Sequence, residues 1–322
     1  MNAMQTFLKL LQDISLHVVV LAGILWLAVF LRKTVGARLL MTKMPNVLFP
    51  IASGVKILSK QRVFSHRTAR VLFFATPVIA FLLVPFLFLC LSLFTTGGFA
   101  FVPFGVPYAL FVLYLGLYAF VLSGLSTKSR FALIGAVRGV MRLLSVQLVL
   151  FVIAMIVMLG AHSTDVAGIV QAQKKVWFVF VHFPVAVIFA ACALFLLHIV
   201  RFETPFAQKE IASGVYGEYS GAPYLFLRWA NYVLCAFMAL LGTILFLGGH
   251  NAPFSWDFFS PEAWLAIKTA IVFCFFVLGE NILPDERSDD LFLLAFSGFL
   301  PFCTVWLTAT AGVCLFWGGA VS

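Results

Sequence analysis

Eight apolar runs, most of them long enough to cross a lipid bilayer, constrain this chain more than any other feature. A transmembrane helix needs roughly 20 consecutive, mostly apolar residues. The runs lie near residues 16–31, 71–94, 106–124, 144–160, 176–200, 229–248, 264–279 and 291–317. They predict an all-α integral membrane protein in which eight transmembrane helices form a single polytopic domain over residues 1–322.

The composition supports this class. Hydrophobic residues make up 63% of the chain, charged residues 10%, and the mean hydropathy is +1.09, whereas about a quarter of the residues of a soluble domain are charged. The runs also lack the helical polar stripe that would cover a soluble core. The first run does not read as a cleaved signal, because no small-residue cleavage site separates it from Arg32-Lys33.

The positive charge follows the expected topology. All but four of the 21 lysine and arginine residues lie in the first, third, fifth and seventh connections between runs; the four exceptions are Lys9, Lys174, Lys175 and Lys268. By the positive-inside rule, the odd connections face the cytoplasm or matrix and both termini face the periplasm or intermembrane space. Topology thus accounts for the net charge of +9, and no nucleic-acid partner is needed to explain it.

Two polar segments interrupt the apolar pattern, residues 201–228 and 280–290, and together they hold eight of the 12 acidic residues. Ionisable groups beside apolar spans are costly and are first interpreted as functional. We expect both segments to line a polar cavity, because non-helical backbone at membrane depth needs shielding from lipid. For Asp285, Glu286 and Asp290 a solvated connector is the simpler interpretation, but Glu280 directly continues an apolar run.

The first and third connections carry further candidates. From residue 46 to 61, Ile51, Val55 and Leu58 recur at helical spacing while Lys56 and Lys60 take the opposite face, which predicts an amphipathic interfacial helix. This helix either lies on the lipid surface or forms a lid over a cavity between helices.

In the third connection, Arg138 follows a helical pattern close to the next run, and we expect an acidic partner for it.

Other kinds of chemistry have little support. The six cysteines are scattered singly through apolar runs without C-x-x-C spacing, so we expect no zinc site and no iron–sulfur cluster in this chain. The six histidines are isolated, and no phosphate-binding loop or Ser/His/Asp arrangement is present. A redox centre that serves this protein would come from a partner.

Several motifs, in order, resemble the H subunit of bacterial NADH-quinone oxidoreductase, equivalent to mitochondrial NADH dehydrogenase subunit 1 of respiratory complex I. The most specific is Glu218-Tyr-Ser-Gly-Ala-Pro-Tyr224, followed by Lys268-Thr with Leu283-Pro, Arg287 and Asp289 at the family spacing. Residues 126–138, 165–173 and 243–249 are also similar to the family. The resemblance covers nearly the whole chain.

The resemblance implies an eight-helix subunit at the junction of the membrane and hydrophilic arms of the complex. There it would form the membrane-side wall of the ubiquinone cavity and the start of the proton-coupling path, with an iron–sulfur cluster supplied by a partner subunit. It implies partnership with the other membrane-arm subunits and the hydrophilic subunits of the quinone site. The cavity and path residues would be Glu203, Glu210, Glu218, Arg138, Arg201, Tyr219, Glu280, Arg287 and Asp289, with Lys56 and Lys60 on the amphipathic helix.

The chain also departs from the family pattern, mostly by losing acids. Neutral residues stand where the family has acids, at Ser53, Gln61, Gln147, Leu196, Phe206, Gln208 and Asn231. Arginines of two family motifs are also replaced, by Ile199, Glu280 and Asp285, although Arg201 lies two residues beyond the first. Because neutral side chains cannot change charge state, neighbouring subunits would have to supply acids, or coupling would differ.

Two alternatives remain open from the sequence. The first is the membrane subunit of an energy-converting hydrogenase, which the Glu280-Asn281 pair favours, although the length and residues 165–173 and 243–249 favour the dehydrogenase. The second is a structural or assembly subunit whose proton path has degenerated. The expected location is the mitochondrial inner membrane, to which the high phenylalanine content points, or alternatively a bacterial plasma membrane.

Overall fold

The computed structural model describes residues 23, 26–38, 41, 43–61, 68–90, 104–199, 215–252, 261–282 and 288–318. Within these ranges, the side chains of residues 84–90, 197–199, 262, 280–282, 288–289 and 317–318 are not described. The described residues form helices joined by turns and contain no strand. The predicted all-helical class is therefore confirmed for this part of the chain.

The helices follow the apolar runs closely. Residues 26–38 are helical, and the elements after them are α2 (Phe49–Leu58), α3 (Arg70–Cys90), α4 (Gly105–Ser126), α5 (Arg130–Ala161), α6 (Val166–Ala172), α7 (Phe178–Val181), α8 (Phe183–Ile199), the 3-10 turn η1 (Tyr216–Glu218), α10 (Ala222–Phe246), α11 (Pro261–Ile282), α12 (Ser288–Leu294), the π-helical turn η3 (Ala295–Phe299) and α13 (Leu300–Gly318).

Four described helices are long and apolar enough to cross a membrane: Gly105–Ser126, Arg130–Ala161, Ala222–Phe246 and Asp290–Phe316. Shorter apolar helices cover Arg70–Leu83, Phe183–Leu196 and Ala263–Gly279. Each predicted run after the first thus coincides with a helix, while most of the first run lies outside the described residues. The count of eight spans stays a prediction.

The boundaries of α5 differ from the prediction, and local chemistry explains why. The helix begins at Arg130, well before the predicted run, because the Ser129 side chain accepts a hydrogen bond from the Ala132 amide at 3.2 Å and caps the first turn. Its last residue is Ala161, and the following His162 has a left-handed φ of 51°. At about 1.5 Å per residue, 32 residues extend well beyond the ~30 Å hydrocarbon layer. The residues that form the third connection are therefore largely helical.

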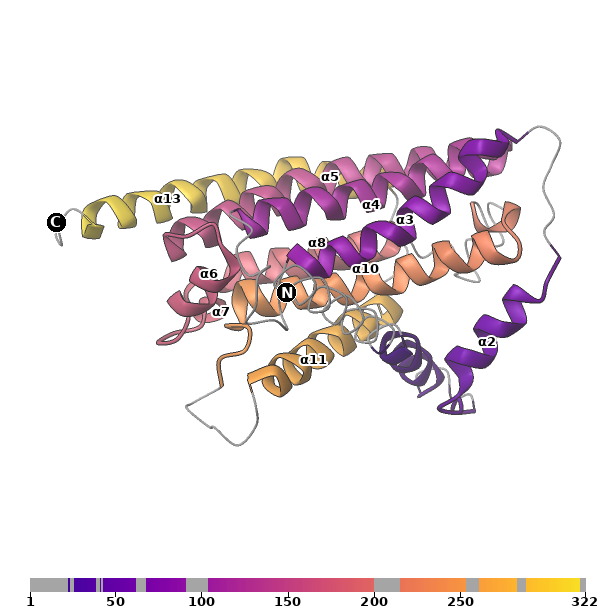
Figure 1. Ribbon diagram of the computed structural model, residues 1–322. Helices are drawn as coiled ribbons and strands as arrows, with labels where there is room; N and C mark the ends of the chain where they lie inside the picture. The colour runs from indigo at the N-terminus through magenta and orange to yellow at the C-terminus, as the bar shows by residue number, and fades with distance from the viewer. Residues whose placement is uncertain are drawn as a thin grey trace, which may run out of the picture.

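The long helices lie side by side and alternate in direction, so their ends collect at two ends of the bundle (Figure 1). At one end α4 finishes and α5 and α10 begin; because Tyr219 lies there, we name it the Tyr219 end. At the opposite end α10 finishes, α11 begins and α6 and α7 lie; we name it the Lys268 end. Among the odd connections, the described residues 126–129 of the third and 215–221 of the fifth lie at the Tyr219 end.

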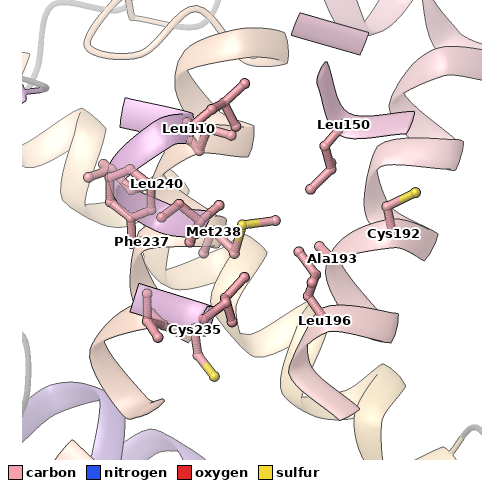
Figure 2. Packing of buried hydrophobic residues seen from close by; sticks show 14 of the residues in the cluster. Leu110, Leu150, Cys192, Ala193, Leu196, Cys235, Phe237, Met238 and Leu240 are labelled. Carbon is pink, nitrogen blue, oxygen red and sulfur yellow. The ribbon is translucent and has the colours of Figure 1, made fainter. Parts of the chain in front are cut away.

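The helix α10 is the centre of the core. Within its most apolar window 94% of the residues are buried, compared with 17% for Asp290–Phe316. It packs against α3, α11 and α8, and Figure 2 shows Met238 of α10 reaching toward α8, which carries Ala193 and Leu196. The outlying α13 packs on α5, and its Trp306 donates a hydrogen bond from Nε1 to His182 Nδ1 at 3.0 Å.

Candidate functional site

The segment before α10 joins several helices at the Tyr219 end. Residues Tyr216–Glu218 form a single 3-10 turn, and Tyr219 continues in an extended conformation. Gly221 then has a φ of 66° and a ψ of −138°, a backbone conformation that a side chain would oppose. Pro223 occupies the first turn of α10, where its missing N–H costs nothing. The sequence therefore directs a sharp turn from this segment into the central helix.

Tyr219 anchors the segment to the ends of α3 and α4. Its side chain is 4% exposed, and its hydroxyl lies 3.0 Å from Ser126 Oγ and donates to the carbonyl oxygen of Ser123 at 3.0 Å. The ring stacks on Phe73, with 4.2 Å between ring centroids and 5° between planes. Burial raises the pKa of Tyr219, although hydrogen bonds from Ser126 and Thr76 act in the opposite direction. Tyr219 is therefore a neutral hydrogen-bonding group at ordinary pH.

Small residues let the segment approach α4 and α5. A Cβ atom placed on Gly124 of α4 would lie 2.8 Å from Val215 Cγ2 and 2.9 Å from Ala136 Cβ of α5. Such separations are closer than van der Waals contact, so only glycine fits between these groups. The close approach holds the segment that carries Glu218 against α4 and the first turns of α5.

The predicted acidic candidates are described to different extents. Glu218 is half-buried in the 3-10 turn. Glu280 lies in the last turn of α11 and Asp289 lies in α12, but their side chains are not described. The other four charged candidates of the two polar segments lie outside the described residues: Arg201, Glu203, Glu210 and Arg287. Their meeting with Glu218 in one cavity stays a prediction.

The basic candidates are exposed. Arg138 lies on an exposed position of α5 at the Tyr219 end, and its acidic partner also stays a prediction. Lys56 and Lys60 are exposed at the end of α2 and just after it. Their positions leave these charges open to the headgroup region or to a partner subunit.

The amphipathic helix is present as α2 and packs on the central helix. Its buried residues are Pro50, Gly54 and Ile57, and a Cβ on Gly54 would meet the Trp229 ring of α10 at 3.3 Å. Leu48, Ile51, Val55 and Leu58 are exposed. The helix therefore has one face against α10 and a second apolar face turned outward, so a lipid-facing role and a covering role are both compatible with its geometry.

Three of the positions where neutral residues replace family acids, Gln147, Leu196 and Asn231, lie in described helices of the bundle. Gln147 of α5 accepts hydrogen bonds from two tyrosines of α4. The Tyr114 hydroxyl donates to its main-chain carbonyl oxygen at 2.9 Å, and the Tyr118 hydroxyl donates to its Oε1 at 3.0 Å. Leu196 is 2% exposed in the core, and the Asn231 Oδ1 accepts from Cys235 Sγ at 3.4 Å. The two tyrosine bonds join α4 to α5, whereas the Asn231–Cys235 bond lies within α10, and none of these contacts involves a carboxylate.

A polar cluster at the Lys268 end was not assigned any role from the sequence. Lys268 and Gln173 are buried, at 7% and 0% exposed, and both bond to the loop that follows α10. A signal was present, because a lone lysine inside the run 264–279 needs compensation. Its partners could not be found from sequence, since they are backbone carbonyls brought close only by the fold.

The comparisons with known proteins agree with this architecture. A family model described as NADH dehydrogenase matches residues 12–311. The H subunit of NADH-quinone oxidoreductase from Paramagnetospirillum magneticum is 30% identical, over 94% of this chain and 91% of that protein. Its counterpart from Rhodospirillum rubrum is also 30% identical, over 94% and 92%. NADH-ubiquinone oxidoreductase chain 1 of Chondrus crispus is 27% identical, over 95% and 96%. With most of its length matched, this chain belongs to the NADH dehydrogenase family of membrane subunits.

Proposed function

We propose that this chain is a core membrane subunit of a proton-translocating NADH:ubiquinone oxidoreductase, respiratory complex I. Relatives named as the H subunit or chain 1 of such enzymes match it over nearly their whole length, which supports the role of such a subunit. In this proposal the chain crosses the membrane eight times, and both termini lie on the intermembrane-space or periplasmic side. The membrane is the mitochondrial inner membrane or, alternatively, a bacterial plasma membrane.

The Tyr219 end would form the membrane-side wall of the ubiquinone cavity. The observation that carries this part is the anchored segment Val215–Gly221: a buried tyrosine holds a carboxylate-bearing turn against the ends of α3 and α4. Such a rigid wall can hold Glu218 beside a bound quinone headgroup and supply a proton as the quinone is reduced. The undescribed residues Glu203 and Glu210 would complete the acidic lining together with Glu280.

Electrons would reach the quinone from an iron–sulfur cluster of a hydrophilic partner subunit. The part assigned to this chain is thus binding, orientation and proton supply. Arg138, Arg287 and Arg201 would pair with acids of the two polar segments and fix their positions. Lys56 and Lys60 on α2 would lie at the mouth of the cavity, near the headgroups or a partner.

The test replaces Glu203, Glu210 and Glu218 one at a time with Gln in the assembled complex. Quinone reductase activity and proton pumping should fall, because an amide cannot release a proton. NADH oxidation by ferricyanide, an acceptor that does not use the quinone cavity, should stay unchanged. Wild-type quinone reduction and pumping in all three variants would defeat the assignment.

A structural or assembly subunit is the second candidate, and the neutral contacts of Gln147, Leu196 and Asn231 favour it. Under this alternative, the chain would hold the complex together while other subunits move protons. Normal pumping in the three Gln variants, combined with loss of assembly when the chain is deleted, would support it. Co-purification of a nickel–iron subunit in place of NADH-oxidising partners would instead support the hydrogenase.

A further inference from the structure

Lys268 of α11 is bound by three main-chain carbonyl oxygens at the end of the central helix. Its Nζ donates to Leu247 at 2.7 Å, to Asn251 at 2.6 Å and to Gly249 at 3.2 Å. An ammonium group has three N–H donors, so every donor is used. The side chain is 7% exposed, which makes the arrangement a buried binding site for the protein's own cation.

The loop after α10 is shaped to direct its carbonyls at one point. Gly248 and Gly249 have left-handed φ angles of +70° and +53°. A Cβ on Gly249 would lie 2.9 Å from Val170 Cγ2, so the loop can turn back only with glycine there. The carbonyl oxygens at a helix C-terminus carry the negative end of its dipole. The ammonium group thus neutralises the end of α10 while it bonds to the loop.

The Trp177 ring completes the site. Lys268 Nζ lies 4.4 Å from the centre of that ring, within the range of a favourable cation–π contact. Trp177 precedes α7, so the site joins the connection between α6 and α7 to α10 and α11. The charge is stabilised by peptide dipoles and an aromatic face.

Gln173 also binds this loop, and Asn251, a residue of the loop, binds α6. Gln173 Oε1 accepts from the Gly248 amide at 2.9 Å, and its Nε2 donates to the carbonyl oxygen of Ile244 at 2.9 Å. Asn251 Nδ2 donates to the carbonyl oxygen of Val170 at 2.7 Å. The loop is consequently held at several points, and displacement of Lys268 would leave buried carbonyl groups without donors.

We propose that Lys268 is a positioning residue for quinone reduction: its ammonium group holds α10 and α11 in register at the Lys268 end, and this register places Glu218 and Glu280 at the Tyr219 end. The inference rests on the proposed function of the Tyr219 end. It adds a residue at the opposite end of the bundle, away from the proposed quinone site.

The geometry of the two helices explains the transmission. The segment with Glu218 and Tyr219 leads directly into α10, and Glu280 lies in the last turn of α11. At about 1.5 Å per residue, the 25 residues of α10 span about 37 Å. A packed helix moves as a nearly rigid rod, so a slip at one end reaches the other. Beside Lys268, the hydroxyls of Thr243 and Thr269 lie 3.4 Å apart and join the same two helices.

The experiment measures steady-state reduction of a short-chain ubiquinone by the purified complex that carries Lys268→Ala. The quinone kcat/KM should fall about tenfold or more, since displacements of about 1 Å at a reacting centre can have such effects. NADH oxidation by ferricyanide and the subunit content should stay at the wild-type level. Lys175→Ala, which removes an exposed lysine at the same end, is the matched control and should behave as wild type.

Chemical rescue separates positioning from general packing. n-Propylammonium replaces the side-chain atoms that Lys268→Ala removes and should restore the rate. Tetramethylammonium has the charge but no N–H donor, and propanol has no charge, so neither should restore it. Equal recovery with tetramethylammonium, or a wild-type kcat/KM without any additive, would overturn the proposal.

Two further variants keep the proposal testable if Lys268→Ala does not assemble. Lys268→Arg retains the charge but cannot place three donors at one point, and Trp177→Leu removes only the aromatic face. Each should assemble and lower the quinone kcat/KM, and wild-type kinetics in both would refute the positioning role. If the Lys268 variants reduce quinone at the wild-type rate while Glu218→Gln is defective, only the positioning role of Lys268 is refuted. If the Gln variants of Glu203, Glu210 and Glu218 all have wild-type activity, the proposed function of the Tyr219 end is refuted.

Discussion

Replacing Tyr219 with Phe removes one hydroxyl from the anchor of the candidate site and leaves the ring in place. The hydroxyl contacts Ser126 Oγ and the Ser123 carbonyl oxygen, each at 3.0 Å. Phe keeps the stacking on Phe73 and the shape of the side chain. The change therefore isolates the hydrogen bonds that hold the Glu218 turn against α4.

The expected cost follows from what remains after the change. Ser126 Oγ still donates to the Ser123 carbonyl oxygen at 2.7 Å, so no buried polar group loses its last partner. A neutral hydrogen bond whose loss leaves no buried polar group unpaired contributes about 1 kcal/mol. This corresponds to a factor of about 5 in the equilibrium constant for local opening. Tyr219→Ala also loses the ring and should cost about 3–5 kcal/mol.

Amide hydrogen exchange of the purified complex, read by mass spectrometry, tests this ranking. Peptides that cover residues 215–225 should exchange about fivefold faster in Tyr219→Phe, because local opening limits their exchange. Tyr219→Ala should exchange much faster still, while peptides at the Lys268 end stay unchanged. Identical exchange in wild type and Tyr219→Phe would refute the claim that the hydroxyl anchors this segment.

Three further predictions concern other contacts. Gly124→Ala should destabilise the protein by about 1–3 kcal/mol in thermal unfolding, because the new Cβ would lie 2.8 Å from Val215 Cγ2. The control Gly116→Ala, whose Cβ would lie 3.6 Å from Leu234 Cδ2, should have little effect. Equal melting temperatures of the two variants would contradict this prediction. Gln147→Leu should lower the free energy of unfolding by about 1–3 kcal/mol, because the Tyr118 hydroxyl loses its acceptor. Adding Tyr118→Phe should recover part of that stability. A double variant that is no more stable than Gln147→Leu alone would disprove the explanation. Burial, Lys174 and Lys268 lower the pKa of His250, so its stabilising contribution is present above about pH 6.5 and is lost as the pH falls through the lower folded pKa. Amide exchange in residues 247–252 should therefore rise in acid, and His250→Asn should flatten that rise; the same acid dependence in both proteins would count against it.

The helices were the most predictable part of the fold, because hydrophobic length is a local property of the sequence. The runs after the first all coincide with helices, and α2 occupies the predicted amphipathic segment. The beginning of α5 was not predicted, since a hydropathy pattern locates the membrane-embedded part and does not report that a helix continues past it. The Ser129 cap was the available signal.

The candidate site was predictable in residue type but only partly in contacts. The sequence singled out Glu218 and Tyr219, yet the stacking on Phe73 and the hydroxyl contacts with α4 depend on residues at least 93 positions away in the chain. Lys268 was noted as an exception in the charge distribution and as part of a family motif, without a role of its own. Its role depends on backbone carbonyls, and no residue type marks those in a sequence.

The central claim is that the Tyr219 end faces the quinone, and photolabelling tests it most directly. The assembled complex is incubated with a photoreactive ubiquinone analogue, irradiated and digested, with excess unlabelled ubiquinone as the competitor. The account predicts competed label on this chain within residues 201–221, which include Glu203, Glu210 and Glu218. Competed label confined to the Lys268 end or to α13 would contradict it.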